Sequence, residues 1–214
     1  MNSPSPIAPS QVETQAGASL PFSQRKGMKL KPINYFKLIH RYIPPGSFVY
    51  RVYIPHVSLT TAKALKIARR LGLSHEQLIF IEEASMLHDI GIVRVKRYSF
   101  APRVNLPYMC HAPAGREILE REGLPKHALV AERHIGVGIS KEEIIANRYP
   151  LPPHDLIPES LEEKIISWAD LFFSKTPDRL WFEKSLADVE QTVARYGERQ
   201  LKVFHEWLVF FGSE

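Results

Sequence analysis

A histidine–aspartate pair at the end of an apolar helix is the feature that most constrains this sequence. His88 and Asp89 follow FIEEASML and precede Ile90-Gly91-Ile92. A carboxylate that is carried into the interior on such a helix is costly unless a cation or strong hydrogen-bond donors compensate it. An imidazole beside a carboxylate is a natural ligand pair for a divalent ion. A His–Asp hydrogen bond at a helix end is the other interpretation, and the dipeptide alone does not choose between them.

A second carboxylate, Asp170, lies on another apolar helix. In SLEEKIISWADLFFSK, the residues one turn to either side of Asp170 are Ile166 and Phe173, so its face of the helix is apolar. No lysine or arginine on the same stripes is an evident partner for the two acids. This pattern favours a shared cation, and an aspartate that is bonded to backbone amides is the alternative.

Three further histidines stand where helices are expected to begin or end. His56 precedes the first core helix, His111 begins HAPAGREILEREGLP, and His134 lies in AERHIGVG. Each of them, taken alone, is more often structural or exposed than a metal ligand. We consider them together because their order along the chain, with the two acids, is not random.

Helical signals dominate the chain after about residue 28. Ser74, Ser140 and Ser160 each precede Gln or Glu by three positions, which is the capping-box pattern of a helix start. Apolar spacing predicts a first core helix that ends at Gly72, a central helix that ends near His88, helices at 114–122 and from 125 to about 136, and a C-terminal packing helix at about 184–211. Only residues 48–54 suggest a short extended segment. The predicted fold class is therefore all-α.

The first 27 residues differ in composition from the rest of the chain. They are rich in Ser, Pro, Gln, Ala and Gly and lack periodic apolar positions, so we predict a poorly ordered tail at 1–27. Residues 28–214 are expected to form a single domain, with its motifs between 48 and 176. Met28 is an alternative start of translation.

Composition limits the class of protein. The one cysteine, Cys110, cannot form an internal disulfide, and neither a secretory leader nor an apolar run of membrane-spanning length is evident. We therefore predict a cytoplasmic protein without a membrane partner. The net charge of +5 is spread over faces of mixed sign, which favours small phosphorylated ligands and makes a nucleic-acid partner unexpected. A homodimer is one assembly that the sequence allows.

The six residues, in their order and contexts, resemble the HD superfamily of metal-dependent phosphohydrolases. The resemblance covers roughly residues 48–176 and is carried by PHVSLTTAKALKIARRLGL, EEASMLHDIGI, HAPAGREIL and EKIISWADLF. It is closest in character to the small HDIG-type proteins of bacteria and archaea. It implies an HD-domain helical bundle.

The resemblance also implies a dinuclear metal site. His56, His88, Asp89 and Asp170 would hold one ion, and Asp89 would bridge to a second ion held by His111 and His134. Two divalent ions can share a bridging water, lower its pKa and stabilise the attacking and leaving oxygens of a phosphoester. Without thiolate ligands, iron, manganese, cobalt, nickel and zinc all suit the set.

Cations near the motifs are candidates to contact phosphate. Besides His88 and Asp89, we predict Arg133 as a catalytic residue because it adjoins His134. Glu82 and Glu83 are candidates to orient water or ligands. The weaker candidates for phosphate contact are Arg94, Lys96, Arg97, Arg116 and Lys141.

The predicted function is hydrolysis of a phosphomonoester or phosphodiester, expected to be that of a nucleotide. The chain reads HDIGIV, without the lysine that follows HDIG in many members, and it lacks the Gly-Tyr-Pro motif of cyclic-di-guanylate phosphodiesterases. The order of ligands is also similar to that of bacterial diadenosine-tetraphosphate hydrolases. Two alternatives stay open: a di-iron oxygenase of the same superfamily, and a non-catalytic nucleotide-binding regulatory module.

Overall fold

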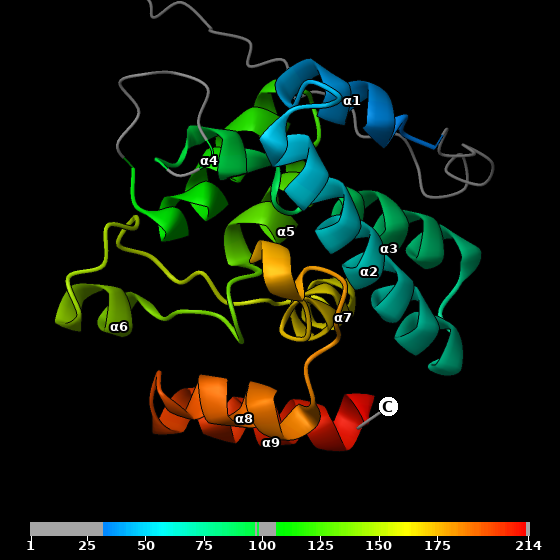
Figure 1. Cartoon of the computed structure of the whole chain (residues 1–214). Helices are drawn as coiled ribbons and strands as arrows, with labels where there is room; N and C mark the ends of the chain where they lie inside the picture. The colour runs from blue at the N-terminus through cyan, green and yellow to red at the C-terminus, as the bar shows by residue number, and fades with distance from the viewer. Residues whose placement is uncertain (1–31, 97, 99–105, 213–214) are drawn as a thin grey trace, which may run out of the picture. The chain divides into compact units, whose positions relative to one another are not determined.

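The computed structural model describes residues 32–96, 98 and 106–212. Within these residues the chain forms helices joined by loops, and β pairing is limited to two isolated bridges, Val95 with Leu106 and Ile139 with Leu156 (Figure 1). The predicted all-α fold class is confirmed. The predicted tail and Met28 lie outside the described residues.

The α-helices follow one another without intervening strands in the described residues. Their bounds are α1 (Tyr35–Tyr42), α2 (Phe48–Arg70), α3 (His75–Leu87), α4 (His111–Arg121), α5 (Pro125–Arg133), α6 (Lys141–Ala146), α7 (Leu161–Asp170), α8 (Leu186–Ala194) and α9 (Glu198–Phe211). A short 3-10 helix, Ile90–Arg94, directly follows the His-Asp pair.

The long helix α2 links two apolar clusters. Its first half adds Tyr53 and Val57 to a cluster with α1 and α4, and its second half adds Ala64 and Ile67 to a cluster with α7, α8 and α9. It packs along α3 and α7, while α4 packs on α5 and on the 3-10 helix at Ile90–Arg94 (Figure 1). His56 lies in the first half of α2, between Tyr53 and Val57.

The predicted capping boxes hold at two of the three serines. Ser74 with Gln77 and Ser140 with Glu143 exchange both side chain–backbone hydrogen bonds. The Ser160 side chain accepts from the amide of Glu163, but the Glu163 carboxylate accepts from the amide of Glu159 instead of returning to Ser160. The third box is therefore only half formed.

Residues 48–54 are helical, so the expected extended segment is wrong. The Ser47 side chain caps the start of α2 by accepting from the amide of Tyr50. Val49, Val52 and Tyr53 are buried, and their spacing of three and four positions places them on one helix face. The apolar residues at the start of this segment thus follow a helical period.

The single C-terminal helix expected at about 184–211 is also wrong. The chain forms two helices, α8 and α9, which pack on each other and are separated at Gly197. Gly197 has a φ of 128°, a left-handed conformation that glycine adopts most readily. The turn returns α9 to the core, where Phe204 packs 5.1 Å from Trp168 of α7 between ring centroids.

Among the described residues, no helix is both long enough and apolar enough to cross a membrane.

Candidate metal centre

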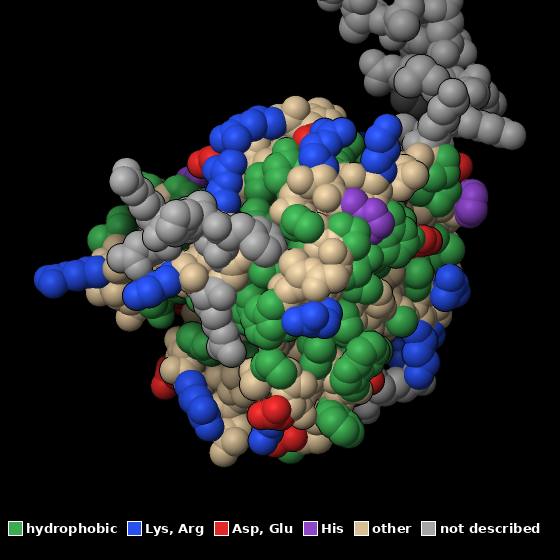
Figure 2. Space-filling model, turned by 45° about the horizontal axis from the view of Figure 1, so that its top comes forward, with side chains coloured by type: hydrophobic (Ala, Val, Ile, Leu, Met, Phe, Trp, Pro, Cys, Tyr) green, Lys and Arg blue, Asp and Glu red, His purple; other side chains and the backbone are tan. Residues whose placement is uncertain are grey.

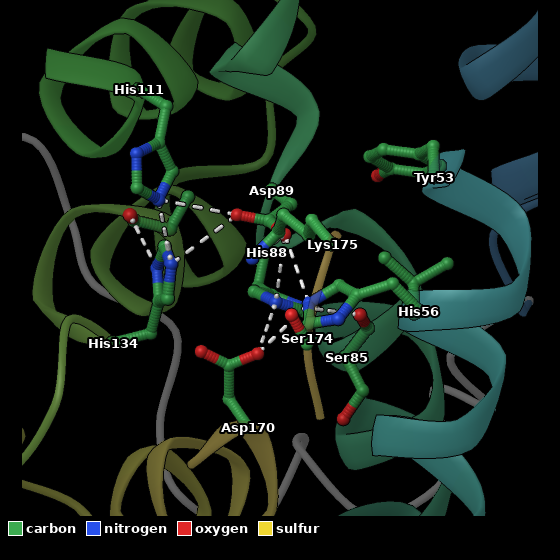
Figure 3. Close-up of polar contacts among 12 residues, drawn as sticks. Tyr53, His56, Ser85, His88, Asp89, His111, His134, Asp170, Ser174 and Lys175 are labelled. Carbon is green, nitrogen blue, oxygen red and sulfur yellow. Dashed lines mark hydrogen bonds and ion pairs between the residues drawn. The ribbon is translucent and has the colours of Figure 1, made fainter. Parts of the chain in front are cut away.

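The six predicted ligands come from five helices and converge in one buried cluster (Figure 3). His56 lies within α2, His88 caps the end of α3, and Asp89 is the next residue. His111 begins α4, His134 follows the last residue of α5, and Asp170 ends α7. Five of the six are at most 2% exposed, and the side chain of Asp170 is 16% exposed.

The carboxylate of Asp89 faces a different group of histidines with each oxygen. Its Oδ2 lies 3.1 Å from His56 Nε2 and 3.4 Å from His88 Nε2. Its Oδ1 lies 3.2 Å from His111 Nε2 and 3.4 Å from His134 Nε2. Asp89 is therefore placed between two clusters of nitrogen ligands, as a bridging carboxylate would be.

Asp170 completes the first of these clusters. Its Oδ1 lies 2.9 Å from His56 Nε2 and 3.3 Å from His88 Nε2. These three residues form one group whose ligand atoms all lie within 4.8 Å of one another, and His88, Asp89 and His134 form another. Two neighbouring groups of nitrogen and oxygen donors can hold two divalent ions.

Backbone carbonyls fix the orientation of three ligand histidines. The Nδ1 atoms of His88, His111 and His134 lie 2.6, 2.5 and 2.8 Å from the carbonyl oxygens of Ser85, Tyr108 and Ala131. A carbonyl oxygen only accepts, so each Nδ1 must donate a proton. In the neutral ring, Nε2 then carries the lone pair and points into the centre.

The arrangement of these lone pairs fits a cation. His111 Nε2 and His134 Nε2 are 3.1 Å apart, and with both protons on Nδ1 two lone pairs would face each other. This contact is repulsive unless a positive charge lies between or beside the two nitrogens. A divalent ion held by both rings supplies that charge.

Several ligand atoms also lack a hydrogen-bonding partner among the described residues. They include Nε2 of His56 and of His88, Oδ1 of Asp89 and Oδ1 of Asp170. These atoms are close to one another, but their contacts do not have hydrogen-bond geometry. Buried polar atoms without partners are expensive, so their convergence supports a metal site.

The pKa values of His88 and His134 shift in opposite directions. Burial opposes the charge on His88, but Asp89 and Asp170 outweigh burial and raise the pKa of His88 to about 10. Burial lowers the pKa of His134 to about 4, and the neighbouring His88 and His111 act in the same direction. In the chain without metal, His88 therefore carries a proton at neutral pH while His134 presents a free lone pair.

Gly91 brings α4 into the centre. A Cβ at this position would lie 2.0 Å from the carbonyl oxygen of His111 and 2.3 Å from the amide nitrogen of Gly115. Both atoms belong to the backbone, which cannot move aside as a flexible side chain can. Glycine therefore lets the segment after Asp89 touch the first turns of α4, and this contact places His111 beside Asp89.

Lys175 is the residue that the sequence reasoning missed. Its Nζ lies 2.6 Å from Asp89 Oδ2, and its side chain is only 11% exposed. Burial disfavours its charge, but Asp89, Tyr108 and Asp170 outweigh burial and raise the pKa of Lys175 well above its usual value. Asp89 therefore has a basic partner, which lies on the loop after α7 and not on the helix stripes that the sequence analysis considered. The available signal was a lysine five positions after Asp170.

Arg133, the predicted phosphate-contacting residue, faces other groups. Its Nη1 lies 3.1 Å from Glu159 Oε2 and 3.3 Å from Glu163 Oε2. His134 follows it directly, but neighbouring helical side chains point about 100° apart. Its catalytic role stays a prediction, and the contacts favour Lys175 as the cation nearest the metal ligands.

Several of the other predicted polar residues also contact groups outside the cluster. Glu82 accepts from the Tyr35 hydroxyl, and Glu83 accepts from the amide of Ile33 and contacts His127. These glutamates anchor the segment that leads into α1 rather than reach the metal ligands. Of the basic candidates, Arg94 pairs with Glu117, and Arg116 pairs with Glu120 and Glu132. The backbone amide of Lys141 donates to Asp155. Arg97 lies outside the described residues.

A family model for the HD domain matches residues 53–173, which is more than half of the chain and includes all six ligands. The chain belongs to the HD domain family. The recognition that was based on the ligand order is confirmed at this level.

Relatives of this HD protein occur among archaeal proteins. A tRNA (cytidine(56)-2'-O)-methyltransferase of Picrophilus torridus is 29% identical over 203 residues, which cover 90% of this chain and 54% of that protein. A methyltransferase of the same name from Thermoplasma volcanium is 32% identical over 122 residues, 56% of this chain and 31% of that protein. An uncharacterized protein of Methanocaldococcus jannaschii is 36% identical over 115 residues, 53% of this chain and 56% of that protein. The chain thus spans about a third to somewhat over half the length of these relatives.

Among solved structures, the HD domain of the Listeria monocytogenes phosphodiesterase PgpH is similar to this HD protein. The match covers 82% of this chain and 95% of that domain, with 16% sequence identity and a TM-score of 0.46.

Proposed function

We propose that this HD protein is a metal-dependent phosphohydrolase that cleaves a phosphate ester of a small molecule, most suitably a nucleotide. The position of Asp89 carries the proposal: its two oxygens face two separate groups of histidine nitrogens. The groups adjoin each other through one carboxylate, which is the arrangement that two-metal hydrolysis requires.

Each ligand residue has a distinct task in this proposal. His56, His88 and Asp170 would hold one divalent ion, His111 and His134 the other, and Asp89 would contact both. Bound ions would lower the pKa of a water molecule and neutralise charge on phosphoryl oxygens. The carbonyl partners of His88, His111 and His134 keep the Nε2 lone pairs directed inward, and burial keeps bulk water from the ligands.

The ligand chemistry limits the choice of metal. The set consists of four histidines and two aspartates, with no thiolate among the six residues, so iron, manganese, cobalt, nickel and zinc all suit it. Iron would also permit the alternative function, oxygenase chemistry at the same ligands. Consumption of dioxygen by iron-loaded protein with a small organic substrate would favour that alternative.

The names of two relatives concern methyl transfer to a tRNA. The alignments cover only 31% and 54% of those proteins, and a cluster of four histidines and two aspartates is a metal-binding arrangement. We therefore propose no methyl transfer for this chain. The names do justify including RNA-derived phosphates, such as oligonucleotides with terminal or cyclic phosphates, among the substrates to be tested.

The deciding experiment compares metal content and hydrolysis in wild-type protein and Asp89→Ala. We expect close to two metal ions per wild-type chain, phosphate or alcohol release from bis-p-nitrophenyl phosphate or a member of a nucleotide panel, and loss of both properties in the variant. His127→Ala is a matched control because His127 is buried but contacts Glu83 instead of the centre. Wild-type protein that takes up no metal, even after reconstitution, would contradict the proposal and favour a non-catalytic binding module.

A further inference from the structure

A pocket of about 930 Å³ adjoins the metal centre. Its size lies within the range of small-molecule binding sites. It is open to solvent on one side and contains no Asp or Glu among its described lining residues. These residues are Val95, Lys96, Tyr98, Leu106, Pro107, Tyr108, Phe173, Ser174, Lys175, Thr176 and Lys184.

Lys175 joins the pocket to the metal ligands. Its side chain lines the pocket, and its Nζ lies 2.6 Å from Asp89 Oδ2 (Figure 3). Tyr108 makes a second connection, since it lines the pocket while its ring lies 4.6 Å from the His111 ring between centroids. The pocket therefore reaches the metal centre through Lys175 and Tyr108.

The pocket has the character of a site for an anion with a planar ring. Lys96, Lys175 and Lys184 contribute three cations to its wall. A row of rings leads outward from the metal ligand His111, with Tyr98 6.4 Å from Tyr108 between ring centroids. Positive charge near the metal ligands would attract phosphate, and the aromatic row would contact a flat, apolar group attached to it.

Lys175 is placed so that its ammonium group could contact a phosphate in place of the Asp89 carboxylate. It lies on the loop that follows α7, five residues after Asp170, and its ammonium sits on a flexible four-carbon chain. Without metal, it neutralises Asp89. Ions held by Asp89 would take over that neutralisation, and the ammonium would then be within reach of a phosphate that approaches the same carboxylate from the pocket.

We propose that this pocket receives the substrate, a phosphoester of about mononucleotide size that carries a planar ring, and that Lys175 contacts its phosphate. This inference rests on the proposed function, because it assigns the substrate side of the same metal centre. A second pocket also combines cations with aromatic rings, with Lys63, Lys66 and Arg70 on its wall, but Glu183 lines it as well. Figure 2 shows the Lys and Arg side chains of one face spread among apolar groups.

The test measures binding separately from catalysis. Wild-type protein, Lys175→Met and Lys175→Arg are loaded with the metal that the wild type retains, the ions per chain are counted, and the affinity for inorganic phosphate is measured by calorimetry. Lys126→Met is the matched control, because it removes the same charge from an exposed position on α5. The affinities for phenyl phosphate and methyl phosphate are compared in the wild type and in Tyr108→Leu, which leaves the backbone carbonyl that orients His111.

We expect Lys175→Met to keep its metal ions and to bind phosphate at least about tenfold more weakly, as loss of a charge-assisted hydrogen bond predicts. Lys175→Arg should recover part of the affinity, and Lys126→Met should match the wild type. Phenyl phosphate should bind more tightly than methyl phosphate, and Tyr108→Leu should remove that preference.

Two results would overturn the inference in distinguishable ways. Metal-loaded Lys175→Met that binds phosphate as tightly as the wild type would refute the role of Lys175 and leave the metal centre intact. Wild-type protein that binds no metal would refute the proposed function, and Lys175 would then be a permanent partner of Asp89. If Lys175→Met does not fold, Lys175→Gln decides the matter, since metal-loaded Lys175→Gln that binds phosphate as tightly as the wild type contradicts a direct contact.

Discussion

The α carbon of Gly91 lies so close to α4 that an added methyl group would be 2.0 Å from the carbonyl oxygen of His111. The glycine of the HDIG sequence is thus a point of backbone contact between two ligand-bearing segments. It serves the geometry of the centre without touching a metal.

Gly91→Ala should therefore impair both stability and metal binding. The clash involves backbone atoms, so we expect destabilisation of about 3 kcal/mol, at the upper end of overpacking effects. Gly115→Ala is the milder comparison, because its Cβ would lie 3.1 Å from the Cβ of Ala131. Chemical denaturation and metal analysis of both variants check this, and equal stability of Gly91→Ala and the wild type would show that the contact is not tight.

Because the carboxylate of Asp89 faces two groups of histidines, we expect substitution of a ligand to remove either one metal ion or both, depending on the residue. His134→Ala should retain about one ion per chain, and so should His56→Ala, because each removes a ligand from one side only. Asp89→Ala should retain neither ion, since both sides share its carboxylate. Metal analysis after exhaustive dialysis measures these ratios. Loss of both ions from His134→Ala would indicate a single coupled site instead.

The raised pKa of His88 predicts how the stability of the metal-free protein depends on pH. The pKa of His88 is about 10 in the folded chain and near 6.5 in the unfolded chain, so its contribution is complete below pH 6.5 and is lost as pH rises through about 10. Thermal unfolding of chelated wild type and His88→Gln across this range tests the sign. The stability advantage of the wild type should shrink as pH increases, and parallel curves would contradict the shift.

The ion pairs of Arg133 predict a structural role that can be separated from catalysis. Arg133→Gln should destabilise the protein by about 1–3 kcal/mol, because the buried carboxylate of Glu163 would lose its ion pair with Arg133. Metal content and the Michaelis constant should stay near wild-type values. A large rise in the Michaelis constant with unchanged stability would instead restore Arg133 as a phosphate contact.

Part of the cluster of candidate ligands could be anticipated because the contexts of its residues are local. His88, Asp89 and Asp170 each stand on a strongly apolar helix, where a polar residue is conspicuous. His56, His111 and His134 could be selected as candidates only because their order matches the family pattern. Their convergence depends on how α2, α4 and α5 pack, which a single sequence does not reveal.

The errors have equally specific causes. Helix periodicity does not indicate Lys175 as a partner of Asp89, because this lysine reaches Asp89 from a loop. The C-terminal stripe of apolar residues continues on both sides of Gly197, so its period concealed the turn between α8 and α9. At residues 48–54, apolar side chains on successive positions obscured a helical face that only packing made evident.

Three of the metal ligands obtain their orientation from a carbonyl group only three residues earlier in the chain. The inner half of the site is therefore encoded in short stretches of chain at helix ends. Of the residues in the pocket wall, only Tyr108 supplies one of these carbonyls, and it does so through its backbone. Substitutions in the loops can alter which molecule is admitted without disturbing the tautomers of the histidines. Such a chain can change its substrate during evolution while it retains the same inorganic chemistry.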